Sequence, residues 1–408
     1  MVDREVSPGL SERWATIGAG QEVGLLAVQL WLVEMPFRRP VRTARGTHRR
    51  RPLVMVHLVA QASGSLVEGW GECAALADTT FDREDVTRSF ALLEHALVPG
   101  LVDRSPRAGG RLPRPSELAT IRRAAPDATL AFAALEMAVA DAHLRAEGRS
   151  LADVLGVGTV PVPVGAVVGQ ARSLDLLVAE AGRWVEAGYR RLKIKIGPGW
   201  DVAPIEAVTR TFPDVAVQVD ANGSYREDQG GLLAALDPFG LLCIEQPLTR
   251  DDLEGHARLA ARLRTPICLD ESLDSLRTTR TALDRSACSV VCVKPSRLGG
   301  LGAALGVVEL CAERGVPMWM GGMYESGYAR GVNATLAALP GFAWPGDLSP
   351  ADGYLGADLV PARPARRDVS GRSMVVDLPS GPGVGPSPNR ELLERLVQRR
   401  SWIELPRS

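Results

Sequence analysis

The sequence predicts an α/β protein in which a (β/α) barrel follows a smaller α+β lobe. From about residue 160, short apolar runs alternate with segments of helical pattern, which is typical of parallel βαβ units. One strand–helix unit of a barrel spans about 25 residues, and barrel enzymes carry their sites at the C-terminal strand ends. An open doubly wound sheet would not bring five consecutive strand ends to one point. Five polar residues lie 24 or 25 residues apart at the ends of successive predicted strands, namely Lys195, Asp220, Glu245, Asp270 and Lys294.

The barrel strands are predicted where apolar, often β-branched residues form short runs that stop at a polar residue, Gly or Pro. These runs are 160–168, 191–196, 215–220, 241–246, 265–271, 288–295 and 316–322. Helical patterns follow them at 173–188, 201–212, 228–237, 251–264, 274–285, 300–314 and 326–338. The tract GGLGAALG lacks the third glycine of a dinucleotide-binding loop, so we expect it to open a helix whose N-terminus can also hold an anion.

The first lobe is predicted as an antiparallel meander covered by helices. Between its first two strands, residues 37–50 form an arginine-rich loop, either a solvated surface loop or a flexible cover for an anionic ligand. The Gly- and Pro-rich C-terminal stretch is expected to pack back on this lobe, and residues 1–22 to be loosely held. The predicted strands are 24–36, 52–60 and 66–72, and the helices are 84–98, 115–123, 128–147 and, near the C-terminus, 389–399.

Composition restricts the possible partners and the compartment. The 408 residues are 46% hydrophobic and carry a net charge of -1, which argues against a nucleic acid or an anionic membrane as partner. No apolar run is long enough to span a bilayer, and the N-terminus lacks the pattern of a secretory signal. The six cysteines are scattered without a CxxC pair, which favours buried thiols in a reducing cytoplasm over disulfides or a zinc site.

Lysine is rare in this chain, and its positions are informative. Only Lys193, Lys195 and Lys294 occur among 47 basic residues, so 44 are arginine. Codon bias accounts for the general replacement of lysine by arginine. It does not account for three lysines inside apolar strand-like runs, where an amine with a removable proton is useful and arginine cannot serve.

The three acidic residues at strand ends predict a divalent metal site. Convergent carboxylates repel one another unless a cation neutralises them, and hard oxygen ligands select Mg²⁺, Mn²⁺ or another divalent metal. We therefore assign Asp220, Glu245 and Asp270 as metal ligands, although a single such residue often only caps a helix. Glu271 should point elsewhere, into the surroundings of the site or a helix start, and Asn222 either orients a ligand water or a lysine or caps a helix.

Lysines on both sides of this cation predict proton abstraction next to a carboxylate. Lys193 and Lys195 share one face of a strand, and Lys294 comes from across the mouth. Cations near one another lower each other's pKa, and Arg297 should add to this effect at Lys294. The metal would bind the substrate carboxylate and stabilise an enediolate while a neutral lysine takes the α-proton. The histidines form no HExxH motif and GxSxG is absent, which disfavours zinc-protease and serine-hydrolase chemistry.

These residues, with VDAN, IEQP, LDES, EGWGEC, KPSRLGG and GGMYESG, closely resemble the muconate-lactonising subgroup of the enolase superfamily. Within it the sequence is most similar to the o-succinylbenzoate synthase / N-acylamino acid (N-succinylamino acid) racemase family, over roughly residues 25–405. The resemblance implies an α+β capping domain on a modified (β/α)7β barrel. The implied parts are an N-terminal extension (1–24), the capping domain (25–155, completed by 350–408) and the barrel (156–349).

The resemblance also implies residue roles. Lys195 would be the acid/base lysine of the KxK pair with Lys193, and Lys294 the opposing lysine. In a synthase reaction Lys195 would take the α-proton and help a hydroxyl leave, while Lys294 stabilises the enediolate; in racemisation the two would exchange proton roles. Arg297 mildly favours retained racemase activity. The stretch with Gly322, Met323 and Glu325 would line the substrate pocket, and residues 37–50 would form a mobile cover.

One departure from the family pattern concerns specificity. Where a GVSVG-like first barrel strand would present a small polar side chain to the substrate, this chain reads GAVVG and places Val167 there. A hydrogen bond to an acyl or carboxylate group is lost, so the preferred acyl substrate is open while the reaction type is not affected.

The leading hypothesis is an o-succinylbenzoate synthase of menaquinone biosynthesis that also has N-succinyl or N-acylamino acid racemase activity. The alternatives are the racemase as main role, a dipeptide epimerase, a muconate cycloisomerase or, remotely, a non-catalytic carboxylate-binding barrel. The expected partners are a small carboxylate substrate and further copies of the chain in a homo-oligomer, with no nucleic acid and no membrane.

Overall fold

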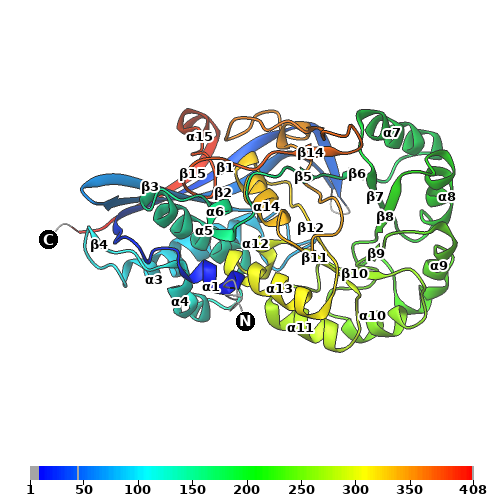
Figure 1. Ribbon diagram of the computed structural model, residues 1–408, viewed down its shortest axis with the longest axis horizontal. Helices are drawn as coiled ribbons and strands as arrows, with labels where there is room; N and C mark the ends of the chain where they lie inside the picture. The colour runs from blue at the N-terminus through cyan, green and yellow to red at the C-terminus, as the bar shows by residue number, and fades with distance from the viewer. Residues whose placement is uncertain (1–8, 44–45, 407–408) are drawn as a thin grey trace, which may run out of the picture.

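The computed structural model describes residues 9–43 and 46–406, and it contains an antiparallel capping sheet beside a parallel barrel (Figure 1). The capping sheet has the order β15-β1-β2-β3, with the short β4 also paired to β1. Its long central strands form a hairpin with antiparallel register from Gly24↔Gln61 to Thr43↔Gly46. The bounds are β1 Gly24–Thr43, β2 Gly46–Ala62, β3 Ser65–Cys73, β4 Gly110–Arg111 and β15 Val397–Glu404.

The longest helix of the first lobe, α5 (Thr129–Ala146), packs directly on β3. The alternating glycines of EGWGEC make this close approach possible. A Cβ on Gly71 would lie 2.0 Å from the Ala134 carbonyl oxygen, and one on Gly69 would lie 2.2 Å from that of Ala138. The other helical segments of this lobe are α2 Val86–Leu92, a π-helical turn Leu93–Leu97, α3 Val98–Val102, a 3₁₀ turn Pro115–Glu117 and α4 Ala119–Ala124.

Seven parallel strands form the barrel sheet in the order β12-β11-β10-β9-β8-β7-β6. Consecutive strands are neighbours throughout, as the predicted βαβ repeats require, and the helices lie outside the curved sheet (Figure 1). The strands are β6 Ala166–Val168, β7 Arg191–Lys195, β8 Ala216–Asp220, β9 Ile244–Glu245, β10 Ile267–Leu269, β11 Val290–Val293 and β12 Met318–Met320. The helices are α6 Leu151–Leu155, α7 Leu174–Ala187, α8 Val202–Thr211, α9 Gly230–Ala234, α10 Leu253–Ala260, α11 Leu276–Asp284, α12 Pro295–Leu298, α13 Leu301–Arg314 and α14 Gly327–Ala337, with 3₁₀ turns Glu227–Gln229 and Asp237–Phe239.

An extended segment, residues 342–347, lies between the two ends of this sheet. On one side Met318 bridges Phe342, and the Asp347 amide donates to the Met320 carbonyl at 2.8 Å. On the other side the Gly165 amide donates to the Gly346 carbonyl at 2.8 Å. The segment thus connects β12 to the residues just before β6 and completes the (β/α)7β arrangement implied by the family resemblance.

The C-terminal stretch returns to the first lobe, as expected, but it does so partly as a strand. Helix α15 (Arg390–Leu396) is followed by β15, which pairs antiparallel with β1 from Ala27↔Glu404 to Val33↔Val397. The predicted helix up to residue 399 was too long, because its last residues belong to this edge strand. The remaining short elements are β5 Val162–Pro163, β13 Arg366–Arg367, β14 Met374–Val376 and a 3₁₀ turn Ala351–Gly353.

Two expectations about irregular segments were wrong. Residues 37–50 are not a loop, because outside residues 44–45 they extend β1 and β2, with pairs such as Arg42↔Thr47. Arginine side chains can remain in solvent on an exposed hairpin, so the polarity of this stretch did not require an irregular backbone. The N-terminal segment is not loosely held from residue 10 onward either. Helix α1 (Leu10–Ala15) contacts α13, and its Trp14 and the following Ile17 are buried.

The described residues contain no helix that is long and apolar enough to cross a membrane. All six cysteines are free and buried, as their positions in apolar runs predicted.

Candidate active site

The C-terminal ends of the barrel strands bring the three predicted carboxylates to one edge of the sheet. Asp220 pairs in register with Lys195 on one side and with Glu245 on the other. Glu245 in turn pairs with Cys268, two residues before Asp270. The exposed fractions of the three acidic residues are 1%, 0% and 2%, so the cluster is buried beneath the mouth.

Lys193 occupies the centre of this acidic cluster. Its Nζ lies 2.6 Å from Asp347 Oδ2, 3.1 Å from Glu245 Oε2 and 3.2 Å from Asp220 Oδ2. The same nitrogen stands 4.7 Å from the ring centre of Trp319, in cation–π contact. Burial lowers the pKa of Lys193, but the carboxylates outweigh burial and raise the pKa well above its usual value. With these carboxylates beside it, Lys193 is a buried cation.

Lys195 is the lysine that reaches the open part of the mouth. About 31% of its side chain is exposed, whereas the side chains of Lys193 and Lys294 are at most 10% exposed. Its Nζ donates to Asp220 Oδ2 and to Asn222 Oδ1, each at 2.6 Å. Asn222 therefore contacts a lysine, as one of the two roles predicted for it requires.

A second hydrogen bond holds Asn222 in this orientation. Its Nδ2 donates to Glu271 Oε1 at 2.9 Å, and its backbone has a φ of 45°. Glu271 thus points toward the lysine side of the site rather than into a helix start. Its other oxygen, Oε2, is buried without a hydrogen-bond partner.

Lys294 stands on the other side of the cluster and contacts a different carboxylate. Its Nζ donates to Asp270 Oδ2 at 2.7 Å. Arg297 contacts the other oxygen of Asp270 and also donates to Asp82 at 2.7 and 3.0 Å. Asp82 belongs to the first lobe, so the capping domain contributes an acidic residue to the surroundings of Lys294.

The pKa directions in this site differ from the sequence-based expectation. Burial lowers the pKa of Lys195, but Asp220 raises it above the usual value. Burial and Arg297 also lower the pKa of Lys294, but Asp270 outweighs both and raises it above the usual value. The expectation of lowered lysine pKa values took the carboxylates as neutralised by a dication, whereas here the carboxylates pair with the lysines directly.

Buried carboxylates of this kind fit a divalent cation. Burial and the neighbouring Asp220 raise the pKa of Glu245 to about 8, so its ionised form requires additional positive charge. Glu245 and Asp270 also lie close to the sulfur of Cys292, with all ligand atoms within 4.8 Å of one another. The donor set of Asp220, Glu245 and Asp270 consists of hard oxygens, which suits Mg²⁺ or Mn²⁺.

Several site residues were not predicted from the sequence. Asp347 contacts Lys193 and also the buried Arg191, which in turn donates to Gln218 Oε1 at 2.7 Å. Asp347 lies on the segment between β12 and β6, outside the series of 25-residue spacings, so no periodic signal marked it. Asp82 comes from the other lobe, and only the tertiary contact identifies it.

The segment between β12 and α14, residues 321–326, forms the last part of the mouth, and we call it the β12–α14 segment. Gly321 leaves room for Lys294, since a Cβ there would lie 2.5 Å from the lysine Cε. Met323 is buried, and Ser296 beside Lys294 contacts its sulfur at 3.3 Å. A Cβ on Gly322 would lie 2.7 Å from the Asp347 carbonyl oxygen.

Two predicted specificity residues have different surroundings. Glu325 does not present a free carboxylate, because Arg330 and Asn333 donate to its two oxygens at 2.8 and 3.0 Å. Val167 on β6 pairs in register with Lys193, so its half-buried side chain lies on the same face of the sheet as the lysine pair.

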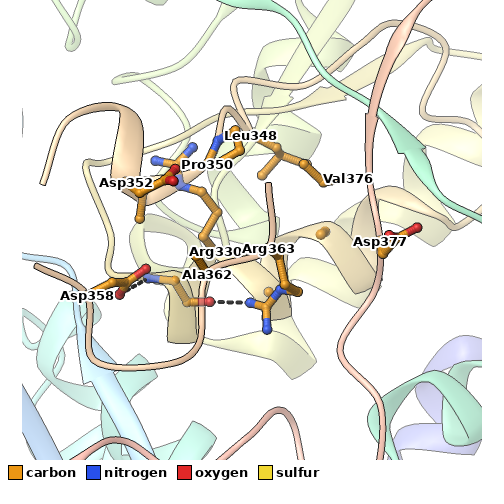
Figure 2. A pocket seen from close by; sticks show the side chains of 13 residues that line it. Arg330, Leu348, Pro350, Asp352, Asp358, Ala362, Arg363, Val376 and Asp377 are labelled. Atoms are coloured by element: carbon orange, nitrogen blue, oxygen red, sulfur yellow. Dashed lines mark hydrogen bonds between the residues drawn. The ribbon is translucent and has the colours of Figure 1, made fainter. Parts of the chain in front are cut away.

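Residues of the C-terminal stretch bind the first residue of α14. Figure 2 shows a small pocket there, with a cavity of about 20 Å³, where Asp358 and Arg363 face the helix. The Gly327 amide donates to Asp358 Oδ1 at 2.8 Å, and Arg363 donates to the Gly327 carbonyl. This cavity has room for about one water molecule, so it is too small to bind a substrate.

Comparison with known proteins places this architecture in a family. Residues 176–392 match the enolase C-terminal domain-like family, and residues 27–156 match the N-terminal domain of the mandelate racemase / muconate lactonizing enzyme family. An N-succinylamino acid racemase from Amycolatopsis sp is 41% identical over 381 residues, which are 93% of this chain and 99% of the relative. An o-succinylbenzoate synthase from Geobacillus kaustophilus is 39% identical over 366 residues, 90% of this chain and 94% of the relative.

The solved structures agree with the sequence relatives. An enolase superfamily member from Listeria innocua superposes with a TM-score of 0.86 at 29% identity, covering 94% of this chain and 100% of that protein. A probable mandelate racemase from Alicyclobacillus acidocaldarius gives a TM-score of 0.82 at 37% identity, covering 93% and 99%. The resemblance inferred from the motifs is therefore confirmed, and the chain belongs to the o-succinylbenzoate synthase / N-succinylamino acid racemase family of the enolase superfamily.

Proposed function

We propose that this protein abstracts a proton next to a carboxylate and acts as an o-succinylbenzoate synthase that also racemises N-succinylamino acids. The observation that carries the proposal is the arrangement of two lysines around one acidic cluster. Lys195 contacts Asp220 from β7, and Lys294 contacts Asp270 from the end of β11. A relative named N-succinylamino acid racemase and one named o-succinylbenzoate synthase each align with this chain over more than nine-tenths of their own length.

Asp220, Glu245 and Asp270 are proposed to hold the divalent metal, with Mg²⁺ as the expected ion. When bound, the metal neutralises the carboxylates, binds the substrate carboxylate and stabilises the enediolate charge. Neutralisation of Asp220 would also weaken its hold on the Lys195 proton, which favours the neutral amine that a general base requires.

Lys195 is proposed to accept the α-proton. Its side chain is the most exposed of the three lysines, and Asn222 accepts a hydrogen bond from its Nζ while Glu271 holds Asn222 in place. In the synthase reaction the proton taken by Lys195 would leave with the departing hydroxyl as water, so acid and base are one group. Lys294 would remain charged and stabilise the enediolate from the other side.

Racemisation is the second proposed activity, because the same two lysines can exchange roles. Lys195 would take the α-proton from one face, and a protonated Lys294 would return a proton to the opposite face. The 41% identity to an N-succinylamino acid racemase favours this activity over a dipeptide epimerase or muconate cycloisomerase. Val167 beside Lys193 is proposed to shape the acyl pocket, and the stretch with Gly322, Met323 and Glu325 is proposed to line the substrate pocket.

The proposed setting follows from these activities. The substrate would be a small carboxylate, the synthase activity would serve menaquinone biosynthesis, and the enzyme would act in the cytoplasm as a homo-oligomer. Relatives named o-succinylbenzoate synthase from Geobacillus and Bacillus subtilis support the synthase activity on which this proposed setting rests.

Deuterium exchange at the α-carbon tests the proposed chemistry directly. Magnesium-loaded enzyme in D₂O should exchange the α-proton of an N-succinylamino acid, and Lys195→Arg should abolish exchange because arginine does not give up its proton. In Lys294→Ala, racemisation should be lost, whereas slow exchange of the enantiomer whose proton faces Lys195 should remain.

The control and the contradicting outcomes are also defined. Arg83→Met removes an exposed ion pair with Asp251 on the surface and should leave exchange unchanged. Binding of the substrate without any exchange in the wild type would show a carboxylate-binding barrel and overturn the proposal. Faster exchange of dipeptides than of succinylated amino acids would show a dipeptide epimerase.

A further inference from the structure

We propose that Arg51, in the capping domain, is a positioning residue that holds the β12–α14 segment in its binding conformation. Arg51 lies on β2 and is 1% exposed, with its guanidinium pointing at the segment. It would act on substrate recognition through the backbone of the segment and touch no reacting atom. The inference rests on the proposed function and assigns to that site a residue that determines its substrate preference.

The contacts of Arg51 are unusual for a buried cation. It donates to the carbonyl oxygens of Met323 and Tyr324, each at 3.1 Å, and to those of Ala74 and Ala75 at 2.7 and 2.6 Å. A further bond goes to the neighbouring carbonyl of Pro52. Among the described residues, no carboxylate accepts a hydrogen bond from the guanidinium. Backbone carbonyls accept its hydrogen bonds, and Glu72 and Glu325 stabilise its charge electrostatically. Burial of a charge is costly in free energy. Here the rigid guanidinium fork of Arg51 joins three separate stretches of chain.

The backbone that Arg51 bonds is strained at Tyr324, so these hydrogen bonds stabilise an unfavourable conformation. Tyr324 has a φ of 56°, in the left-handed region that residues with a Cβ rarely adopt. Arg51 Nε donates to the carbonyl of this same residue. Tyr324 remains 40% exposed as a residue, and its ring makes edge contacts with Phe37 and Tyr354, at centroid distances of 5.7 and 5.4 Å. The strained conformation therefore sets where an exposed aromatic ring stands at the mouth.

A second capping residue holds the other end of the segment. Glu72 on β3 is 1% exposed, and it accepts hydrogen bonds from the Ser326 amide at 2.9 Å and from the Ser326 hydroxyl. Arg51 and Glu72 thus bind the segment at 323–324 and at 326, from adjacent strands of one sheet. Gly321, at the start of the segment, adjoins Lys294. The capping sheet therefore determines how far the segment stands from the catalytic lysine.

The experiment compares Arg51→Met with Arg122→Met in the magnesium-loaded full chain. Arg122, a half-buried arginine, is the control because it also donates to backbone carbonyls of the first lobe, those of Ala125 and Pro126, and none of its described hydrogen bonds reaches the segment. For α-proton exchange of N-succinylphenylalanine, Arg51→Met should raise KM about tenfold with kcat changed less than twofold, since small misplacement of a binding wall costs binding. N-succinylglycine, which has no side chain to place, should show no such rise.

Two further variants separate positioning from general stability. Arg51→Lys keeps a buried cation and should recover part of the KM, because an ammonium can bond one or two of the carbonyls. In the Tyr324→Gly background, where a positive φ carries no strain, Arg51→Met should change KM less than in the wild type. A lowered Tm with an unchanged KM for both substrates would overturn the proposal and leave Arg51 a stabilising residue only.

Amide hydrogen exchange gives a readout independent of the reaction. Peptides covering 321–326 should exchange faster in Arg51→Met than in Arg122→Met, while peptides of α5 remain protected in both. Wild-type enzyme without any α-proton exchange would refute the proposed function alone. Unchanged protection of 321–326 in Arg51→Met would refute the positioning role, whatever the reaction proves to be.

Discussion

At the scale of single residues, Asp347 is the carboxylate that pairs with two buried cations. It contacts Arg191, and its Oδ2 lies 2.6 Å from Lys193 Nζ. These cations outweigh burial and hold the pKa of Asp347 well below its usual range. Its charge is therefore central to the electrostatics of the site.

Asp347→Asn should strongly destabilise the protein. The substitution leaves Lys193 and Arg191, both almost fully buried, with less compensation for their charge. Loss of one partner of a buried ion pair costs about 3–5 kcal/mol, and a smaller value is expected here because Lys193 keeps its contacts with Glu245 and Asp220. Urea unfolding at pH 7 measures the change. A variant as stable as the wild type would show that the remaining carboxylates suffice for both cations.

At the scale of elements, the periodic patterns predicted most barrel strands and helices to within a few residues. These patterns predicted the wrong backbone structure for the arginine-rich hairpin and for β15. The polarity of a stretch does not decide whether its backbone forms a strand. The β15 strand forms because its backbone pairs with β1, a contact between residues such as Ala27 and Glu404 that lie at opposite ends of the chain. The GGLGAALG tract (residues 299–306) opens helix α13, as predicted, and the anion at the helix N-terminus is a carboxylate of this chain, Glu136.

Glu136 predicts a pH-dependent contact between α5 and α13. Its carboxylate accepts from the amides of Leu301 and Gly302, and burial raises its pKa to about 7. Because the folded pKa lies above the unfolded one, this group's stabilising contribution is complete below about pH 4.5 and is lost as the pH rises through about 7.

Glu136→Gln should remove this pH dependence while keeping an acceptor oxygen for the two amides. Between pH 5 and pH 8 the free energy of unfolding of the wild type should fall by about 2 kcal/mol more than that of the variant. Parallel denaturant titrations at the two pH values measure the difference. Identical pH dependence in both proteins would mean that Glu136 ionises in the folded state as readily as in the unfolded chain.

At the scale of the whole molecule, the two lobes form one site. The capping domain contributes Asp82 beside Arg297, and it holds the β12–α14 segment through Arg51 and Glu72. The barrel contributes the carboxylates and the lysines. A divalent cation bound among these carboxylates should therefore stabilise the whole folded molecule, since unfolding disperses the ligands.

Metal binding should appear as a concentration-dependent rise in Tm. At a Mg²⁺ concentration about 100 times the Kd, the added stability is about 2.7 kcal/mol by mass action. EDTA should reverse the rise, and Glu245→Gln should reduce it strongly because one charged ligand is lost. Asp251→Asn, at an exposed surface ion pair, is the matched control and should retain the full rise. An equal rise in Glu245→Gln would place the ion elsewhere.

The sequence by itself determined the barrel repeat, the acidic cluster, the three lysines and the family. These features depend on local periodicity and on residue types that each strand carries at its own end. The tertiary structure alone decided which groups pair with which lysine, how the 342–347 segment joins the two ends of the barrel sheet, and how Arg51 reaches Tyr324. Such contacts join residues far apart in the chain, and their energies depend on burial and distance, which no local pattern encodes.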